Sequence, residues 1–265
     1  AEVNIVTTND NPVIINGVTY TKGQVVTKLT TDENGCAQTT ADLLPSGTYS
    51  AVEIKAPQGY LLAGVIIQNF TISKNGEIVD LSAKDTSFKD KVKRGDFELR
   101  KIDSETQESM DGVSFDITNV TTGEKHRFTT DENGYYSSKN DWNPHSQNTN
   151  GGGAEDGLWF GQTTGGAMAA VDDSLGALPY GVYLIDEVEG INNAGKEMFH
   201  GYLYISRNNV TINMGNIENY GDAPEITVNT KVKDPATDTQ YSKAQKDLTV
   251  VDEVSLDGLI PGREY

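Results

Sequence analysis

The sequence predicts an all-β fold made of tandem immunoglobulin- or prealbumin-like β-sandwich domains. Hydrophobicity alternates with period two in many short stretches, such as YSAVEI, FELRKI, VSFDI and GYLYI. Because successive side chains of a strand point to opposite faces, this pattern indicates strands with one buried face. Turn clusters rich in Gly, Asn, Asp and Pro separate the stretches, and almost no segment sustains a helical period over ten residues. Short strands at this spacing are typical of small sandwiches.

Repeated segments give the order of the elements. The string TTDENG occurs at Thr30–Gly35 and again at Thr129–Gly134, each time after an apolar residue. A GxYxxxE element follows each copy, at Gly47–Glu53 and at Gly181–Glu187. Two copies of one ordered set of strands indicate two related modules.

The repeats set the expected domain boundaries. We expect a first sandwich at residues 1–94 and a second at 95–220, with an insertion at about 139–178 between the repeated elements of the second copy. A third, incomplete module is expected at 221–265, where Pro224 indicates a linker. The segment AEVNIVT at the start of the chain aligns with DGVSFDIT, so the first sandwich is expected to lack its first strand.

Composition argues against several classes of function. Asp and Glu total 39 against 21 Lys and Arg, and the net charge of −18 disfavours binding to nucleic acid or to an anionic membrane. The longest apolar run is far shorter than the ~20 residues that span a bilayer. The single cysteine, Cys36, excludes an internal disulfide framework. Without metal-like histidine spacing or motifs such as GxSxG and HExxH, we expect no metal, no cofactor and no turnover enzyme.

Ionisable and amide side chains in the apolar register of the strands are the strongest chemical signal. Lys101 shares a face with Phe97 and Leu99, although lysine is almost never buried without a partner. Glu187 and Asn219 follow the apolar register of their own segments. Burial lowers the pKa of a lysine and raises that of a glutamate, so a neutral amine beside a carboxyl and a carboxamide can form an isopeptide bond and release ammonia. A buried Lys–Glu ion pair with a capping Asn is the alternative interpretation.

The first module repeats two parts of this pattern. Glu53 lies in the register of GTYSAVE, and Asp90 lies in apolar register near the end of the module, where Asp85 is an alternative. The residue that corresponds to Lys101 would lie upstream of residue 1. We therefore expect no bond within this module of the chain, unless a first strand comes from outside.

These motifs resemble the Cna-B family of Gram-positive surface proteins, whose prealbumin-like, SpaA-like sandwiches form Lys-to-Asn or Lys-to-Asp isopeptide bonds with a catalytic Glu. The resembling segments are KID, DGVSFDI, GVYLIDE and GTYSAVEIKAPQGYLL, the last of which is close to the family's E-box. The resemblance implies that Lys101 is the nucleophile, Asn219 the acceptor and Glu187 the catalyst. In the first module it assigns the catalyst to Glu53 and the acceptor to Asp90.

The last segment resembles the start of Thr-Gln ester-bond domains, also called VaFE repeats, of cell-wall adhesins. Thr230 and Asp252 both fall in apolar register and are predicted to be buried. The resemblance implies that Thr230 is the ester nucleophile and Asp252 a helper acid, with the Gln, Glu and His of that family beyond residue 265.

The insertion allows a different function. It is rich in Gly, Asn and Asp and holds Trp142, Trp159 and Phe160, which are candidate ligand contacts of an adhesin tip. The competing interpretation is a structural flap that buries its own aromatic residues.

The expected function is that of stalk modules of an extracellular, cell-wall-anchored adhesin or pilin-like protein, self-stapled by isopeptide and ester bonds. Its expected partners are neighbouring modules of the same protein and a host protein or glycan that the sequence does not identify. A hydrolytic enzyme is the least favoured class.

Overall fold

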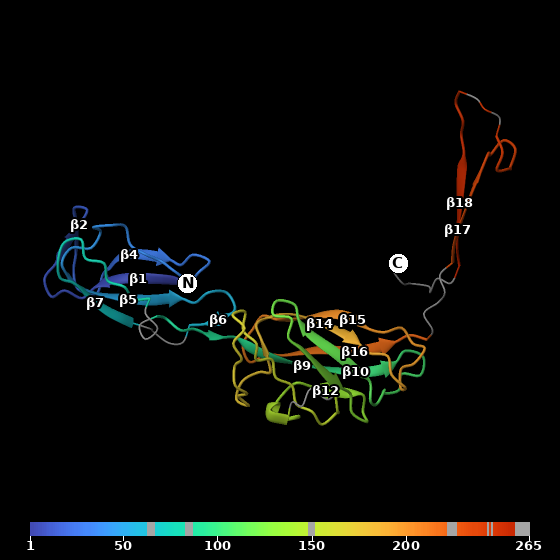
Figure 1. Cartoon of the computed structure of the whole chain (residues 1–265), viewed down its shortest axis with the longest axis horizontal. Coiled ribbons are helices and arrows are strands. Elements are labelled where there is room, and N and C mark those ends of the chain that lie inside the picture. The colour runs from blue at the N-terminus through green and yellow to red at the C-terminus, as the bar shows by residue number, and fades with distance from the viewer. Residues whose placement is uncertain are drawn as a thin grey trace.

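The computed structural model of the chain describes residues 1–62, 67–82, 87–147, 152–221, 227–242, 244 and 246–257. Apart from one 3-10 turn, η1 (His145–Gln147), its regular elements are all strands, so the predicted all-β class is confirmed. The strands form three bodies in a row, which we call the first, second and third modules (Figure 1). The predicted boundaries at 94/95 and 220/221 remain predictions, and they fall beside the start of β9 and the end of β16.

The first module is built on a four-stranded antiparallel sheet. Its strand order is β4-β1-β5-β7, and two short pairs, β2–β3 and β6–β8, accompany it. The strands are β1 (Glu2–Thr7), β2 (Val13–Ile15), β3 (Val18–Tyr20), β4 (Val25–Thr30), β5 (Gly47–Lys55), β6 (Tyr60–Leu61), β7 (Ile67–Ile72) and β8 (Lys91–Val92). Among the described residues, its core holds six buried apolar residues, Val3, Ile5, Ile15, Val26, Tyr49 and Ala51.

The second module has two sheets. One has the order β11-β10-β14-β15, and in the other β9 pairs with β12, β13 and, in parallel, with β16. The strands are β9 (Arg94–Asp103), β10 (Ser114–Asn119), β11 (Lys125–Thr129), β12 (Tyr135–Ser137), β13 (Leu178–Pro179), β14 (Gly181–Glu187), β15 (His200–Ile205) and β16 (Thr211–Asn219). In the part of this module that the structure describes, seventeen buried apolar residues from both sheets and from the insertion form the core.

The strand register confirms that the two modules are repeats of one design. Val3 on β1 faces Glu53 on β5, and Phe115 on β10 faces Glu187 on β14. The hydroxyl groups of Tyr49 and Tyr183 each donate a hydrogen bond to the carbonyl four residues earlier, at 2.8 and 2.7 Å. Glu53 therefore occupies the place in the first module that Glu187 occupies in the second.

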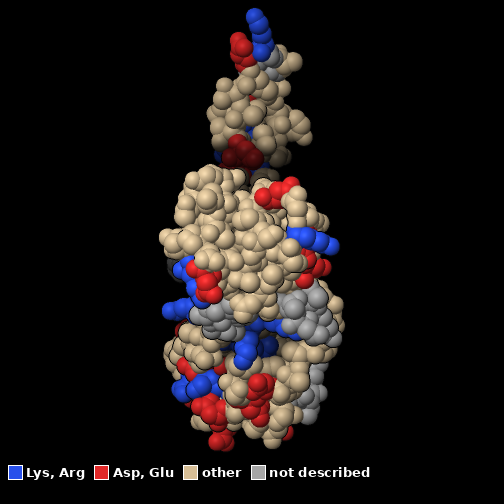
Figure 2. Space-filling view, turned by 90° about the vertical axis from the view of Figure 1, so that its left-hand side faces the viewer, with Lys and Arg blue, Asp and Glu red and all other residues tan. Residues whose placement is uncertain are grey.

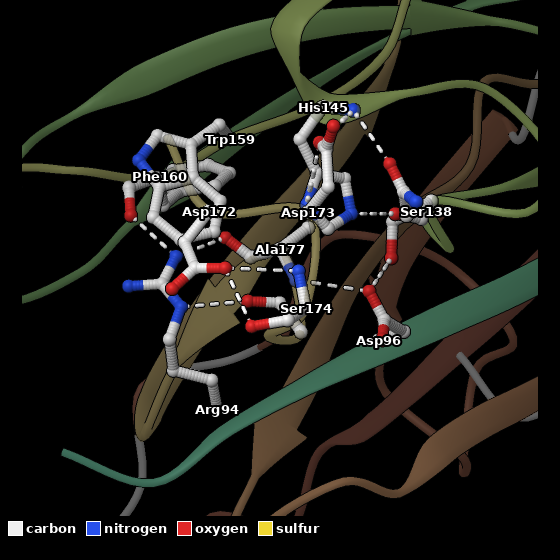
Figure 3. A network of polar contacts seen from close by, with 12 residues as sticks. Arg94, Asp96, Ser138, His145, Trp159, Phe160, Asp172, Asp173, Ser174 and Ala177 are labelled. Carbon is white, nitrogen blue, oxygen red and sulfur yellow. Dashed lines mark hydrogen bonds and ion pairs between the residues drawn. The ribbon is translucent and has the colours of Figure 1, made fainter. Parts of the chain in front are cut away.

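Arg94 at the start of β9 holds the insertion against the second module (Figure 3). Its guanidinium donates hydrogen bonds to the carbonyl oxygens of Phe160 at 2.7 Å and of Gly176 and Ala177 at 2.6 Å each. The same group lies 3.7 Å from the centre of the Trp159 ring, a cation–π contact. Burial lowers the pKa of Arg94 to about 10, so the group stays charged at neutral pH.

A second polar cluster ties the insertion to the same strand. One carboxylate oxygen of Asp96 accepts hydrogen bonds from the Ser138 hydroxyl at 3.0 Å and from the Ala177 amide at 2.9 Å. The buried ring of His145 lies 3.0 Å, through Nε2, from the Ser138 carbonyl (Figure 3). The described insertion is thus anchored to the sandwich through buried residues such as His145, Phe160 and Ala177, whereas residues 163–175 are exposed.

The third module is a two-stranded antiparallel hairpin in the described residues. It pairs β17 (Thr227–Lys233) with β18 (Val251–Asp257) and extends away from the second module (Figure 1). Almost every residue of the two strands is exposed, including the apolar Val228, Val254 and Leu256.

Charge is unevenly distributed over the visible surface. Seen from the end that carries β2 and β7, the nearest face is mostly uncharged, and acidic and basic side chains lie around it (Figure 2). No helix in the described part of the chain is long and apolar enough to cross a membrane. The same residues contain no group of three or more His, Cys, Asp or Glu placed to hold a metal ion.

Candidate functional site

Lys101, Glu187 and Asn219 meet inside the second module, as the strand alternation predicts. Lys101 lies on β9 and Asn219 on β16, and the two strands run parallel in direct contact. Glu187 ends β14 in the opposing sheet. The side chains of Lys101 and Asn219 are fully buried, and Glu187 is 6% exposed. Three polar groups in such a position are stable only if they satisfy one another.

The Glu187 carboxylate touches both nitrogen atoms that an isopeptide reaction needs. Its Oε2 lies 3.3 Å from Lys101 Nζ. Its Oε1 accepts a hydrogen bond of 2.6 Å from Asn219 Nδ2. Lys101 Nζ in turn donates a hydrogen bond to Asn219 Oδ1. One carboxylate thus bridges the attacking amine and the nitrogen that would leave.

The surroundings favour a neutral amine on Lys101. Burial lowers the pKa of its ammonium group below the usual value, and the nearby Glu187 carboxylate offsets part of that effect. A lowered pKa increases the fraction of unprotonated amine at neutral pH, and only the unprotonated amine is a nucleophile.

The structure adds Asn193, which the sequence analysis missed. Asn193 is 1% exposed, and its Nδ2 donates a 2.8 Å hydrogen bond to Glu187 Oε1. The Phe199 amide donates to the other carboxylate oxygen at 2.9 Å. These two donors fix the orientation of Glu187. The repeats give no signal for Asn193, because Gly59 stands at the corresponding place, six residues after Glu53.

In the first module Glu53 and Asp90 lie together, and neither carboxylate forms an ion pair with a lysine among the described residues. Glu53 is 2% exposed, and burial, followed by the neighbouring Asp90, raises the pKa of its carboxyl. A hydrogen bond between the two carboxyl groups also raises the pKa of Glu53, and beyond it the buried Glu53 Oε2 and Asp90 Oδ1 have no hydrogen-bond partner among the described residues. The alternative acceptor, Asp85, lies outside the described residues.

Thr230 and Asp252 share one face of the third-module hairpin. In the register Thr230 faces Val254, and Asp252 faces Val232, so the two polar residues are diagonal neighbours. The prediction that they are buried is wrong for this hairpin, in which both are exposed. The physical reason is that no second sheet covers the hairpin in the described residues.

The three aromatic candidates of the insertion separate into two groups. Phe160 is fully buried and Trp159 is 5% exposed, so their interpretation as ligand contacts is wrong. Phe160 packs in the core against Tyr183, and Trp159 lies under Arg94. Trp142 alone of the three is exposed, and its ring packs edge-on against Tyr135. Trp159 and Phe160 thus agree with the competing interpretation, in which the insertion buries its own aromatic residues, and Trp142 does not.

Comparison with known proteins supports the fold. The profile of SpaA, a prealbumin-like fold domain, matches residues 1–87 and 95–141, together just over half of the chain. No curated protein sequence matches the chain.

Several solved structures are similar at low sequence identity. The Bacillus anthracis TIE protein is 16% identical with a TM-score of 0.45, and the match covers 97% of this chain and 40% of that one. The streptococcal ancillary pilin is 17% identical with a TM-score of 0.30, with 83% and 56% of the two chains covered. GBS52, the minor pilin of Streptococcus agalactiae, is 16% identical with a TM-score of 0.31, and the match covers 83% of this chain and 82% of that one. The chain spans less than half the length of the TIE protein and just over half that of the ancillary pilin. On the profile match, the chain belongs to the SpaA family of prealbumin-like fold domains.

Proposed function

We propose that this chain is a run of structural stalk modules of a Gram-positive cell-wall surface protein, and that its second module staples itself with an isopeptide bond between Lys101 and Asn219. The observation that carries the proposal is the bridging position of Glu187, at 3.3 Å from Lys101 Nζ and 2.6 Å from Asn219 Nδ2. An ion pair alone would not require the carboxylate to contact the amide nitrogen as well.

The reaction follows from these contacts. Lys101 Nζ passes a proton to Glu187 and attacks the carboxamide carbon of Asn219, and Glu187 returns the proton to Asn219 Nδ2. The C–Nδ2 bond breaks, ammonia leaves, and an amide joins the two side chains. The fold holds the reactants in contact. The entropy lost in bringing them together is therefore lost during folding and does not add to the barrier of the reaction. Each chain reacts once, so the protein is not a turnover enzyme.

The position of the bond suits a stalk under tension. The chain enters the second module along β9 and leaves it along β16, and these two strands lie side by side. A covalent bond between them carries a pulling force directly from the first strand to the last. The strands β11, β10, β14 and β15 are then outside the path of the force.

The junction with the first module is also fixed by contacts. The Tyr180 amide donates to the Lys93 carbonyl at 2.7 Å, and Gln58 Nε2 donates to the Tyr180 hydroxyl at 2.7 Å. Such bonds restrict movement of the first module relative to the second. They support neighbouring modules of the same protein as partners. An extracellular, cell-wall location belongs to the same proposal.

We extend the proposal to the third module, where Thr230 would be the nucleophile of a Thr-Gln ester bond and Asp252 its helper acid. Their shared hairpin face, with Val228, Val254 and Leu256 exposed around them, supports this assignment because it brings the two polar residues together among apolar side chains. The glutamine acceptor is not identified in this chain.

Intact mass under denaturing conditions tests the isopeptide bond. The wild-type chain is expected to be lighter than its sequence by one ammonia, and Lys101→Met is expected to have its full sequence mass. Full mass in the wild type would leave Lys101 as an ion-pair partner and would remove the chemical basis of the proposal.

A further inference from the structure

One segment of the second module contacts all three parts of the proposed reaction. Residues 188–199 connect β14 to β15, and we call them the strap. The strap contacts the carboxylate of Glu187, the end of β9 just after Lys101, and the end of β16 just after Asn219. Because β14 and β9 belong to different sheets, the strap joins the two sheets at the strand ends where the site lies.

The first contact of the strap orients the catalyst. Asn193 Nδ2 donates a hydrogen bond to Glu187 Oε1 at 2.8 Å, and the Phe199 amide donates to Oε2 at 2.9 Å. The strap itself holds Asn193, whose Oδ1 accepts a 2.6 Å hydrogen bond from the Gly190 amide. Each oxygen of the carboxylate therefore has a donor from the strap.

The second contact holds the strand of the nucleophile. Lys196 Nζ lies 2.5 Å from Asp103 Oδ2, and Asp103 stands two residues after Lys101 on β9. Both side chains of the ion pair are partly buried, so salt screens them less than it screens an exposed pair. The hydrogen bond from Lys196, together with two backbone amides, holds the pKa of Asp103 well below its usual range. The carboxylate is thus ionised throughout the neutral pH range.

The third contact holds the strand of the acceptor. The Glu197 amide donates to the carbonyl of Tyr220, one residue after Asn219, at 3.2 Å. From the turn after β9, the Ser104 amide donates to the Asn219 carbonyl at 3.0 Å. Among the described residues, β9 is the only strand that pairs with β16. The strap therefore adds a second attachment at the reacting end of β16.

A fourth contact attaches the strap to a turn outside the site. Asn192 Nδ2 donates to the Asp111 carbonyl at 2.8 Å. The next residue, Gly112, has a φ of 65°, and a Cβ there would lie 2.7 Å from the same nitrogen, so the close approach requires glycine. Ile191 on the outer side of the strap is almost fully exposed, whereas Asn193 is buried. The strap thus has solvent on one side and the site on the other.

We infer that the strap aligns Lys101 with Asn219 for bond formation and excludes water from the site, and that Lys196 is the positioning residue whose ion pair with Asp103 keeps it closed. This role rests on the isopeptide chemistry proposed above. Attack of an amine on a carboxamide is fast only while the two groups are held in near-attack contact. Without the ion pair, the strap loses its side-chain contact with β9 and water reaches Lys101.

Closure of the strap affects the reactivity of the amine as well as its position. Burial lowers the pKa of Lys101. The carboxylates that oppose this effect are Glu187, Asp103 and Glu218. Water admitted by an open strap weakens the effect of burial, so the pKa rises and the neutral fraction falls. Loss of the Lys196 charge acts in the same direction, because a nearby cation disfavours the ammonium form. A variant that opens the strap without changing charge separates the two causes.

The rate of ammonia loss from freshly made chain tests this role. The full chain is pulse-labelled by cell-free translation and chased at pH values between about 6 and 9, and its intact mass is followed under denaturing conditions. Lys196→Met breaks the ion pair, Lys196→Arg keeps the cation, and Asn192→Ala removes the contact with the turn without changing charge. The matched control is Lys139→Met, which breaks a more exposed ion pair of the same module with Asp141.

We expect Lys196→Met and Asn192→Ala to lose ammonia roughly ten times more slowly than the wild type. Their rates should also reach half of the maximum at a pH about one unit higher. Lys196→Arg should recover most of the rate, and Lys139→Met should match the wild type. A pH profile that moves in neither Lys196→Met nor Asn192→Ala overturns the inference, because a merely structural loop would change only the rate.

Hydrogen exchange distinguishes failure of the strap from failure of the chemistry. In a Lys101→Met background no bond can form, and the contacts of the strap remain. Adding Lys196→Met should then speed exchange of the Ser104 and Glu197 amides, and adding Lys139→Met should not. This increase, together with full sequence mass in the wild type, would overturn the isopeptide bond and leave the strap in place. Unchanged exchange, together with ammonia loss in the wild type, would overturn the strap alone.

Discussion

Lys101 and Asn219 are 118 positions apart in the sequence, yet their side chains are in direct hydrogen-bond contact in the core of the second module. The contact joins the first strand of that module to its last. A covalent bond here closes nearly the whole module into one loop, and this topology determines the stability and the force response that we expect.

Removing the bond should lower stability strongly. In the chain-entropy description, a cross-link that closes a loop of about 100 residues contributes about 4–5 kcal/mol. Lys101→Met should therefore lower the melting temperature of the second module and speed its proteolysis. Differential scanning calorimetry and timed trypsin digestion measure the change. The control Lys125→Met removes a half-exposed lysine from a surface ion pair and should change little. Equal effects of the two substitutions would contradict the account.

Glu187 should be indispensable to bond formation. Glu187→Gln keeps the shape of the side chain but cannot shuttle the proton, so the chain should fold and keep its full sequence mass. Glu189→Gln, an exposed neighbour, should still lose one ammonia. Ammonia loss in Glu187→Gln would show that the carboxylate is only an ion-pair partner.

Asn193 should act by positioning Glu187. Asn193→Ala removes the 2.8 Å hydrogen bond to Glu187 Oε1, so the carboxylate is held less firmly between the two nitrogens. We expect the bond to form completely but roughly ten to a hundred times more slowly. Mass spectra taken at intervals after refolding give the rate. An unchanged rate would assign Asn193 to loop structure alone.

The buried triad could be predicted from the sequence because strand alternation determines which face a side chain occupies. Lys101 is in phase with Phe97 and Leu99, and the structure buries all three. The pairing of β9 with β16 was also accessible, because the family motifs give the first and last strands. Asn193 could not be found in this way, since it lies in a loop whose conformation depends on long-range contacts.

In the insertion, the local sequence predicts exposed aromatic residues and the structure buries two of them. Trp159 and Phe160 look like surface anchors in a Gly- and Asn-rich segment. In the structure, however, the Arg94 guanidinium binds the Phe160 carbonyl and packs on the Trp159 ring, and both side chains are buried. That contact joins residues about 65 positions apart in the chain, which no local pattern reveals. Alternation puts Thr230 and Asp252 each in the apolar register of its own segment, and only the strand register shows that they share a face. Their burial depends on a covering sheet that alternation does not supply.

The Arg94 contacts should decide the stability of the insertion. Arg94→Ala leaves three carbonyl oxygens without their charged donor and removes the cation–π contact, which should cost about 3 kcal/mol or more. Limited proteolysis should then cut within residues 139–178. Arg100→Ala, on the exposed face of the same strand, is the matched control. Resistance of the Arg94→Ala insertion to cleavage would contradict its role.

The first module should become less stable as the pH rises above the ordinary range of a glutamate. Burial and Asp90 raise the pKa of Glu53 in the folded state, so the folded chain binds more protons than the unfolded chain between the two pKa values. The stabilisation is complete below the pKa of the unfolded state and is lost as the pH rises through the higher pKa of the folded state.

Hydrogen exchange of the β5 amides measures this loss directly. Protection should be greater near pH 4 than near pH 7 once corrected for intrinsic rates, and Glu53→Gln should flatten the dependence. A pH profile that is the same in wild type and Glu53→Gln would show that Glu53 does not titrate in this window.

The most direct test of the central claim is a tryptic peptide map of the denatured wild-type chain. An isopeptide bond at Lys101 blocks cleavage there, so the account predicts one branched species in which residues 101–125 are joined to residues 208–231, lighter than the sum of the two by one ammonia. Fragmentation should place the branch at Lys101 and Asn219. Recovery of residues 102–125 and 208–231 as separate, unmodified peptides would contradict it.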